Sequence, residues 1–496
     1  ELQSRTLISY AVFCLKKTNK QSSDTSRPSR RQFVKGAAAG VAAIGFPTIV
    51  PSSVFGASAP SKIIQVAQIG CGRIARDMEF PGILRHDKIA RYVAVCDLDS
   101  VRVADAKQTL EAAYEKKLNK KVAIKTYENY REMLQDKSID AVAISTPDHW
   151  HALPAIEAAF AGKDVFLQKP ASLTIKEGRQ MADAIRHTKR IFQQGSQQRS
   201  SQQFVRACEL VRNGVIGKVK EVYIGLPIDP PGGRTEEMPI PKNLNYDMWL
   251  GSTPWVYYTE DRVHPQNDDI RKRYGRPGWL RCQQFGAGMI TGWGAHHYDI
   301  LNWALGTEDS GPVEIEGKAE FLKGGLWDVH GPYNITATFA SGTVVHVSNK
   351  LPNGLKFVGE NGQWIWVSRG ATRVTSSDPN AGQPVLKALD ASDPKLLEYQ
   401  LKDSDVHLHH SPKNDHHLDW LTSIQTRKDP VAPAEVGHRA CSECLLSEIA
   451  MRLGRKLKWD PEKERFINDD EANAMLARPQ RKGYSTDEVM KQRGLA

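Results

Sequence analysis

Short hydrophobic segments alternate with helical patterns through the first part of this 496-residue chain. The hydrophobic segments are residues 63–69, 92–97, which end in an acid, 141–147, which end in a polar turn, 164–167 and 191–195. Between them, residues 154–161 and 172–188 have apolar spacing that is typical of helices. Apolar strands that alternate with helices predict a parallel sheet covered on both faces. We therefore expect an α/β fold that begins with a doubly wound Rossmann domain over residues 62–195, whose strand ends face a ligand.

In the remainder of the chain, hydrophobic and polar residues alternate with a period of two. The alternating segments are residues 313–321, 333–339, 343–349, 355–360 and 362–368. This pattern predicts that residues 196–460 form a second α/β domain with a large open, mainly antiparallel sheet. Helical spacing returns at 414–427 and 437–455, and the charged tail 461–496 is expected to lie on the surface. The long irregular stretch 227–277 is typical of a loop that builds a site or an oligomer contact.

A glycine turn follows the first hydrophobic segment, with the sequence Gly70-Cys71-Gly72-Arg73-Ile74-Ala75. Gly70 permits a sharp turn, Gly72 lets the backbone approach a pyrophosphate, and the next helix begins with free N–H groups. Such turns also occur without a ligand. However, Asp97 ends the second strand 22 positions after Ala75, where a dinucleotide fold needs a carboxylate for the ribose hydroxyls. The two features together predict a dinucleotide site.

Composition indicates a soluble globular protein, and its charge does not indicate a nucleic-acid partner. The chain has 67 Lys and Arg against 57 Asp and Glu, and eight of those bases lie within residues 1–35. No basic stripe interleaved with aromatic residues follows, so we expect no nucleic-acid binding. Seven cysteines are too few for a disulfide scaffold, and the Cys441/Cys444 pair has no second pair at zinc spacing. A structural role is therefore expected for these cysteines, with no metal.

Residues 1–61 are similar to an export leader. The run Ser29-Arg30-Arg31-Gln32-Phe33-Val34-Lys35 is a twin-arginine pattern, and a weakly apolar stretch and small residues follow it. Fifteen residues rich in Gly and Ala are too short to span a bilayer, so we expect export to the periplasm or another extracytoplasmic compartment. A chance Arg-Arg pair is the alternative. No other segment reaches transmembrane length, which predicts no stable membrane span.

Two further segments carry residues suited to catalysis. Lys169 ends the fourth strand, where it could bind a substrate hydroxyl and stabilise a developing alkoxide, although a lysine in an ordinary turn is the alternative. His296 and Asp299 are three residues apart on a predicted helix, so the carboxylate could lie near the imidazole, which suits reversible proton transfer. The pair His296 and His297 could bind a metal instead, but no third ligand has a fixed spacing. A second histidine cluster, residues 407–417, is interpreted mainly as a polar loop that enters a helix.

These motifs, in this order, resemble the Gfo/Idh/MocA family of glucose–fructose oxidoreductase, inositol dehydrogenase and rhizopine catabolism proteins over residues 62–460. The residues that carry the resemblance are Gly70-x-Gly72, Asp97, Thr146-Pro147 with His151, Lys169-Pro170 and His296-x-x-Asp299. Within that family, residues 195–200 and 457–461 are similar to the exported twin-arginine branch.

The resemblance implies a Rossmann domain, a second domain whose open sheet supports homo-oligomerisation, a nicotinamide cofactor and a carbohydrate substrate. The implied cofactor-binding residues are Gly70, Gly72, Arg73, Ile74, Asp97, Thr146, Pro147, His151, Gln168 and Lys169. The implied catalytic residues are Lys169 and His296. The implied substrate-binding residues are Lys169, Arg199, Trp293, His297 and Asp299. Asp97 favours NAD because a carboxylate repels the 2′-phosphate of NADP, while the nearby Arg102 leaves NADP open.

Two positions depart from the family pattern. Gln168 replaces the glutamate of a Glu-Lys-Pro turn, and Gly292 replaces an aspartate four residues before His296. The function expected first is oxidoreduction of a sugar or polyol with NAD(P), in which Lys169 polarises a hydroxyl and His296 takes its proton. Export implies a tightly held cofactor that is recycled in place. The alternatives are a glycoside hydrolase or lyase that works by transient oxidation, and a non-catalytic sugar-binding homologue.

Overall fold

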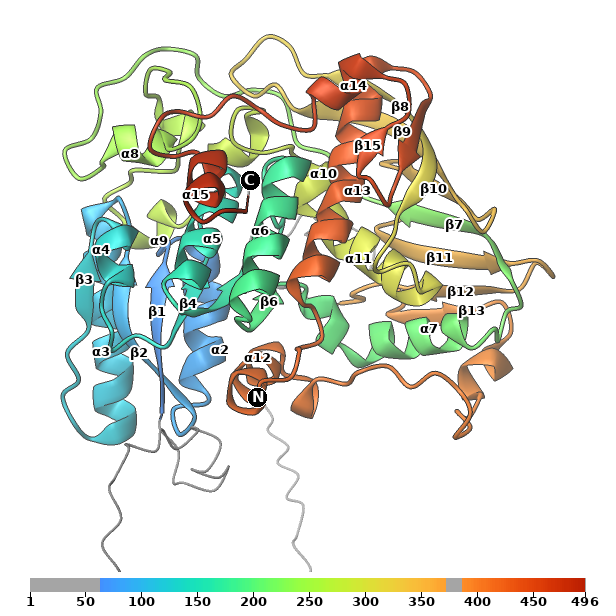
Figure 1. Ribbon diagram of the computed structural model, residues 1–496, viewed down its shortest axis with the longest axis horizontal. Coiled ribbons are helices and arrows are strands. Elements are labelled where there is room, and N and C mark those ends of the chain that lie inside the picture. The colour runs from blue at the N-terminus through green and yellow to red at the C-terminus, as the bar shows by residue number, and fades with distance from the viewer. Residues whose placement is uncertain (1–62, 372–385, 496) are drawn as a thin grey trace, which may run out of the picture. The chain divides into compact units, whose positions relative to one another are not determined.

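The first sheet is parallel throughout, in a computed structural model that describes residues 63–371 and 386–495 (Figure 1). Among the described residues it has six strands, in the order β3-β2-β1-β4-β5-β6. Their bounds are β1 Ile64–Ile69, β2 Ala90–Cys96, β3 Lys125–Tyr127, β4 Ala141–Ile144, β5 Asp164–Leu167 and β6 Phe192–Gln194. The strand order reverses between β1 and β4, which confirms the doubly wound prediction and opens a crevice at their carboxyl ends. The leader predicted at residues 1–61 lies outside the described residues.

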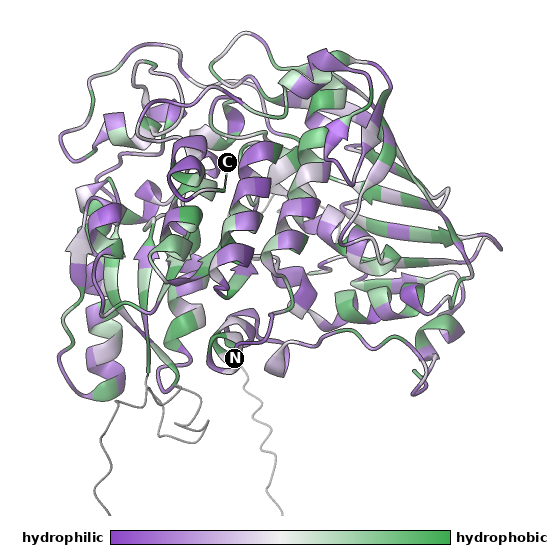
Figure 2. Cartoon of the chain, in the orientation of Figure 1, coloured by the Kyte–Doolittle hydropathy of each residue, from purple (hydrophilic) through white to green (hydrophobic). Residues whose placement is uncertain are grey.

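Helices cover both faces of this sheet because successive strand residues point to opposite sides. On β4, Val142 and Ile144 join the core on one side, whereas Ala141 and Ala143 join the core on the other. The helices are α2 Phe80–Leu84, α3 Ser100–Leu118, α4 Tyr130–Leu134, α5 Ala152–Phe160 and α6 Ile175–Thr188. A π-helix, Ala75–Glu79, precedes α2 directly after the glycine turn. The strands of both sheets carry many of the hydrophobic residues (Figure 2).

Gly70 is required because the turn after β1 packs against Ser145, directly after β4. Its φ is +82°, and a Cβ atom at this position would lie 2.6 Å from the backbone oxygen of Ser145. Such a contact is far inside van der Waals distance, so no other residue fits without moving a strand. The glycine turn therefore keeps two strand ends close together at the crevice.

The second sheet is mixed and mostly antiparallel, as the period-two pattern predicted. Among the described residues its nine strands run in the order β13-β12-β11-β7-β10-β9-β8-β14-β15, with only β7 and β10 paired in parallel. The predicted strands are β8 Pro312–Phe321, β9 His330–Phe339, β10 Val344–Ser348, β11 Gly354–Gly359 and β12 Trp364–Val367. The pattern did not predict β7 Val219–Gly225, β13 Leu389–Ala391, β14 Leu457–Asp460 and β15 Arg465–Phe466 as members of this sheet.

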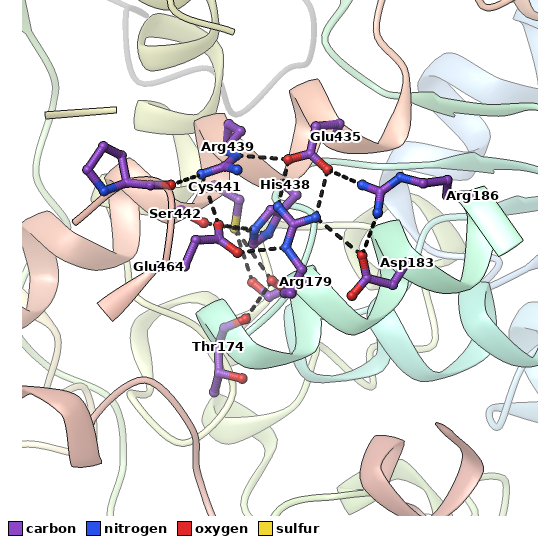
Figure 3. Close-up of polar contacts among 12 residues, drawn as sticks. Thr174, Arg179, Asp183, Arg186, Glu435, His438, Arg439, Cys441, Ser442 and Glu464 are labelled. Atoms are coloured by element: carbon purple, nitrogen blue, oxygen red, sulfur yellow. Dashed lines mark hydrogen bonds and ion pairs between the residues drawn. The ribbon is translucent and has the colours of Figure 1, made fainter. Parts of the chain in front are cut away.

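Helices α7 Gln202–Arg212, α11 Gly294–Leu305 and α13 Ala434–Leu453 pack with the second sheet. Helix α13 also packs against α6 of the first domain, so it is buried on most of its surface. At this junction Arg179 of α6 forms ion pairs with Glu435 of α13, Nη2 to Oε1 2.6 Å, and with Glu464, Nε to Oε2 2.6 Å (Figure 3). Nε2 of the fully buried His438 contacts Glu464 Oε1 at 2.5 Å. A charged network therefore joins the two domains.

The remaining helices lie in loops and in the C-terminal segment. They are α8 Tyr246–Leu250, α9 Ile270–Arg273, α10 Met289–Gly292, α12 His416–Thr426, α14 Asp470–Ala474 and α15 Thr486–Gln492. Helix α15 contacts α5 and α6 and buries Met490, which anchors the end of the charged tail on the first domain. The six cysteines within the described residues are buried and free. No helix in the described ranges is long and apolar enough to cross a membrane.

Candidate functional site

A cavity of about 220 Å³ lies at the carboxyl ends of the strands of the first sheet. Its first-domain walls come from the segments that follow β1, β2, β3, β4 and β5. Its other walls come from residues 275–280, from α10 and the start of α11, and from Arg369 after β12. The cavity is therefore built by both domains at the crevice where a doubly wound sheet binds ligands.

Nine of the ten predicted cofactor-binding residues line this cavity. They are Gly70, Gly72, Arg73, Ile74, Asp97, Thr146, Pro147, Gln168 and Lys169. The Asp97 carboxylate accepts hydrogen bonds from the backbone N–H groups of Cys71, at 2.7 Å, and Asp99, at 2.9 Å. These bonds fix its orientation, and a carboxylate can accept further bonds from a ribose. The bare backbone of the glycine turn and the oriented acid at the end of β2 fit a dinucleotide.

Arg102 lies beside the glycine turn, because its Nη1 is 3.4 Å from the position that a Cβ atom would take on Gly72. Burial raises the pKa of Asp97, and the neighbouring Arg102 guanidinium opposes this rise. Arg102 is therefore placed close to the acid that is predicted to select NAD.

His151 is the tenth predicted cofactor residue, and it does not line the cavity. Its ring nitrogens lie 2.5 Å from the backbone oxygen of Pro170 and 2.9 Å from that of Thr146. Burial lowers the pKa of His151 to about 4. The imidazole thus links the turns after β4 and β5. Its role in the site is to hold these two turns in position.

Gln168 makes a bond that accounts for the altered Glu-Lys-Pro turn. Its Nε2 donates to Oε1 of Glu79 at 2.6 Å, and Glu79 is fully buried. Burial raises the pKa of Glu79 to about 7. The turn itself has no carboxyl group, but Glu79 of the π-helix after β1 places one beside it.

Lys169 and His296 line the same cavity. Lys169 Nζ donates to the backbone oxygen of Gly292 at 2.9 Å. Burial lowers the pKa of Lys169, and the negative charge of Asp148 opposes this shift. Burial, Arg369 and Lys169 hold the pKa of His296 well below its ordinary value, so the imidazole is neutral. A small molecule in the cavity can therefore meet both an ammonium group and an imidazole.

The other predicted substrate-binding residues divide into two groups. Trp293 lines the cavity, with the Arg369 guanidinium 4.4 Å from the centre of its indole. His297, Arg199 and Asp299 do not line it. His297 Nε2 bonds with Oδ1 of Asn353 at 2.8 Å, away from the cavity.

Arg199 and Asp299 form a buried ion pair, Nε to Oδ2 2.8 Å, in which each side chain is 1% exposed. Arg199 also pairs with Glu308, Nη1 to Oε1 2.7 Å. The expectation that Asp299 lies near His296 is therefore corrected, because the acid turns instead to a cation from the segment before α7. Arg199 and Asp299 stabilise the second domain and are not placed to touch a substrate.

Several polar residues that sequence reasoning did not select also line the cavity, among them Asp148, Arg276 and Arg369. Asp148 follows the Thr146-Pro147 motif directly, so the rule that ligands bind at strand ends could have identified it. Arg276 belongs to the stretch 227–277, which was expected to build a site or an oligomer contact, although the sequence did not single out this residue. Arg369 comes from the loop after β12, for which the sequence offers no such signal. The described residues of the second histidine cluster do not line the cavity, and the described part of the chain holds no group of ligands suited to a metal.

Comparisons with known proteins agree with this geometry. Residues 64–196 match a family model described as an oxidoreductase family with an NAD-binding Rossmann fold. Residues 232–362 and 395–486 match the model for the C-terminal alpha/beta domain of the same oxidoreductase family. The matches therefore cover parts of both domains and the residues that line the cavity, except Arg369.

Two curated relatives have different activities in their names. An uncharacterized oxidoreductase of Rhizobium meliloti is 30% identical over 191 residues, which are 38% of this chain and 51% of that protein. A glycosyl hydrolase family 109 protein of Shewanella sp. (strain ANA-3) is 30% identical over 173 residues, 34% of this chain and 36% of that protein. The chain thus matches about half of the first relative's length and about a third of the second's.

A solved structure extends the likeness in fold over most of the chain. The WlbA dehydrogenase of Chromobacterium violaceum, in complex with NADH and UDP-GlcNAcA, has a TM-score of 0.54 and 17% sequence identity. The match covers 81% of this chain and 97% of that one. At this identity the likeness concerns the fold alone.

Proposed function

The chain belongs to the Gfo/Idh/MocA oxidoreductase family, and from that premise we propose that it is an NAD-dependent enzyme that oxidises or reduces a hydroxyl or carbonyl group of a sugar or polyol. The observation that carries the proposal is that Lys169 and His296 line one cavity together with Gly70, Gly72 and Asp97. A substrate held there lies between an ammonium group, an imidazole and the dinucleotide site.

Different residues of the first domain would bind different parts of the cofactor. The turn at Gly70, Gly72 and Arg73 would hold the pyrophosphate, and Asp97 would bind the adenosine ribose. A bound nicotinamide supplies reversible hydride transfer. Lys169, directed by its bond to Gly292, would orient and polarise the reacting oxygen of the substrate.

The cofactor is proposed to stay bound between turnovers, because a loop of the second domain covers its site. Residues 275–280 of this loop line the cavity. The loop is fastened to the start of α3, where the Asp99 carboxylate accepts bonds from His264 Nε2 at 3.0 Å and from Asn243 Nδ2 at 2.8 Å. A cofactor under such a cover leaves only when these bonds open. A protein exported by its twin-arginine pattern would need this arrangement away from the cytoplasmic nicotinamide pool.

The open face of the second sheet is proposed as the surface of a homo-oligomer. Val222, Val345 and Phe357 point into the core, so their neighbours Tyr223 and His346 point to the opposite face. The rings of Tyr223 and His346 stack at 5.1 Å on that face. Aromatic residues on an uncovered sheet suit contact with a second copy. Light scattering on the purified full chain measures the oligomeric state, and a monomer at all concentrations contradicts this proposal.

The experiment that tests the main proposal begins with the purified protein as isolated. Mass spectrometry after denaturation should release a nicotinamide dinucleotide. Addition of sugars and polyols should change the absorbance of the reduced nicotinamide, and Lys169→Ala should abolish that change. Absence of cofactor together with unaltered ligand binding by Lys169→Ala would instead indicate a non-catalytic sugar-binding protein.

The Shewanella glycosyl hydrolase relative favours a second candidate function, glycoside cleavage by transient oxidation. In that reaction the hydride returns to the sugar, so no net change of the cofactor accumulates. Purified protein incubated with aryl glycosides, without added cofactor, separates the two activities. Release of the aglycone supports the hydrolase, whereas net reduction of the nicotinamide without aglycone release supports the oxidoreductase.

A further inference from the structure

His296 is surrounded by groups that disfavour its protonated form. Burial is the main cause of this preference, and Arg369, Lys169, His297 and His416 add to it. Its Nδ1 atom has no hydrogen-bond partner among the described residues, and the acid nearest in sequence, Asp299, is committed to Arg199. A proton accepted by His296 would therefore add positive charge beside two cations, and no carboxylate in the described part of the chain is hydrogen-bonded to its ring to balance it. The imidazole is poorly placed to hold the proton that a substrate hydroxyl releases.

Asp148 lies in the same cavity, but the charge beside it, on Lys169, is opposite in sign to its own. It directly follows the Thr146-Pro147 turn after β4, lines the cavity and is 4% exposed. Its carboxylate interacts electrostatically with Lys169, and its Oδ2 lies 3.5 Å from the hydroxyl of Thr291. A Cβ atom on Gly286 would lie 3.3 Å from the same oxygen, so the wall packs closely around it. The carboxyl group is thus held at the cavity wall, close to the residue that precedes Gly292.

Other buried aspartates of this protein have a direct structural partner. Asp229 pairs with Arg276 and Arg281, Asp164 pairs with Arg427, and Asp299 pairs with Arg199. Asp148 forms no direct ion pair within the described ranges, although it is just as buried. A buried carboxylate without a direct counter-ion is costly and takes up a proton readily. Burial raises the pKa of Asp148, and the charge of Lys169 limits the rise.

We propose that Asp148, with Lys169, is the proton acceptor and donor of the reaction, and that His296 orients the substrate as a neutral hydrogen-bonding group. The inference rests on the proposed function and names a catalytic residue for it. In the oxidation, the O–H bond of the substrate breaks and its proton goes to the Asp148 carboxylate. The C–H bond at the carbon that carries this oxygen breaks as well. Its electron pair leaves with the hydride, which would go to the oxidised nicotinamide that the proposed function supplies. Reduction of a carbonyl reverses both transfers.

Gly292 offers a place to which this acid can be moved. A Cβ atom on Gly292 would have Met289 Sδ, 3.8 Å away, as its nearest neighbour outside the adjoining chain, so a side chain fits there. Gly292 lines the cavity, and its backbone oxygen accepts the bond from Lys169. A carboxylate at this position would lie near the same ammonium group as Asp148. The variant Gly292→Asp in an Asp148→Asn background therefore relocates the proposed proton acceptor.

The test compares Asp148→Asn, His296→Asn and the double variant Asp148→Asn/Gly292→Asp with the wild type. Asp164→Asn is the matched control, since Asp164 is an equally buried aspartate at the opposite end of β5, away from the cavity. Circular dichroism confirms folding, and Asp148→Ser replaces Asp148→Asn if the latter does not fold. Binding of NADH is followed by fluorescence. The pH midpoint of Lys169 acetylation by acetic anhydride, from about pH 6 to 10, is read from its peptide by mass spectrometry and needs no turnover.

The proposal expects Asp148→Asn to bind NADH normally and to lose at least about 100-fold in kcat/KM, with partial recovery in the double variant. Its Lys169 midpoint should fall by about one pH unit or more, because a negative charge near the ammonium group is removed. His296→Asn should lose less activity than Asp148→Asn. The proposal is overturned if Asp148→Asn keeps its activity while His296→Asn loses it, or if the Lys169 midpoint does not move. If no sugar reacts with the wild type, the proposed function fails, and the Lys169 midpoint still decides whether Asp148 and Lys169 act as a pair.

Discussion

Lys169 at the end of β5 donates a hydrogen bond to the backbone carbonyl of Gly292 at the end of α10, with 2.9 Å between Nζ and the oxygen. The bond crosses from the first domain to the second, so the ammonium group has a fixed direction before any substrate arrives. Two of its protons remain for other partners, since an ammonium group has three donors. The contact between these two residues therefore aims the lysine at the space that Asp148 and His296 border.

Replacement of Lys169 by Met should preserve the fold and remove most of the activity. The methionine keeps the length of the side chain but supplies no donor for a developing alkoxide. We expect kcat/KM to fall by about 100- to 1000-fold, which is typical of the loss of one such donor. NADH affinity, measured by fluorescence, should change little. An activity within tenfold of the wild type would show that Lys169 does not contact the reacting oxygen.

Removal of the charge on Asp97 should shift the cofactor preference toward NADP. Asp97→Asn keeps the shape of the side chain and removes the repulsion of a 2′-phosphate, while Arg102 stays beside the turn. We expect the NADPH to NADH affinity ratio to rise by about tenfold or more, which corresponds to about 1.4 kcal/mol. Fluorescence titration with both nucleotides measures the ratio. Addition of Arg102→Gln should cancel the gain, and a ratio that Asp97→Asn leaves unchanged would place the ribose elsewhere.

The part of the site that depends on strand ends could be predicted from the sequence. Gly70, Asp97 and Lys169 each end or follow a short apolar strand, and parallel strands bring such positions to one edge. The partner of Asp299 could not be predicted in this way, because a spacing of three on a helix defines a shared face but not the residue that packs against that face. Arg199, from a segment 100 residues earlier, takes that acid.

The same limit applies to the loops and to the less regular strands. Arg369 follows β12 of the second sheet and lines the cavity together with the strand ends of the first sheet, and no local sequence pattern predicts this position. The strand β7 pairs with β10 and β11, which are more than 100 residues further along the chain, so its place in the sheet depends on long-range pairing. Local periodicity predicts that a strand forms, but not which neighbours it takes.

The buried ion pair of Arg199 and Asp299 should control stability and leave the chemistry intact. Asp299→Asn leaves a buried guanidinium without its main partner, so we expect the free energy of unfolding to fall by about 3–5 kcal/mol. Urea denaturation measures this loss, and Glu314→Gln, which breaks the exposed pair with Lys456, should cost less than about 1 kcal/mol. The activity per folded molecule should be retained at low temperature. A loss of activity without a loss of stability would return Asp299 to the substrate-binding role that the sequence predicted.

The charged network between α6 and α13 should make the protein sensitive to acid (Figure 3). Hydrogen bonds from His438 and Arg179, with the charges of both groups, lower the pKa of Glu464 to about 2 although its burial opposes the shift. A carboxyl group whose pKa is lower in the folded than in the unfolded state stabilises the fold above its unfolded pKa. That stabilisation is lost as the pH falls from the ordinary glutamate value of 4.5 toward about 2.

Glu464→Gln should therefore reduce the stability of the protein at pH 7 more than at pH 3. We expect the difference in the free energy of unfolding between these two pH values to be smaller by about 2 kcal/mol in the variant, because a neutral amide has no charge to lose. Urea denaturation at both pH values, with wild type in parallel, gives this difference. Glu462→Gln, at an exposed position two residues earlier, is the control and should follow the wild type. If Glu464→Gln has the same pH dependence as the wild type, the acid sensitivity comes from other carboxylates, such as Glu435, which also pairs with Arg179.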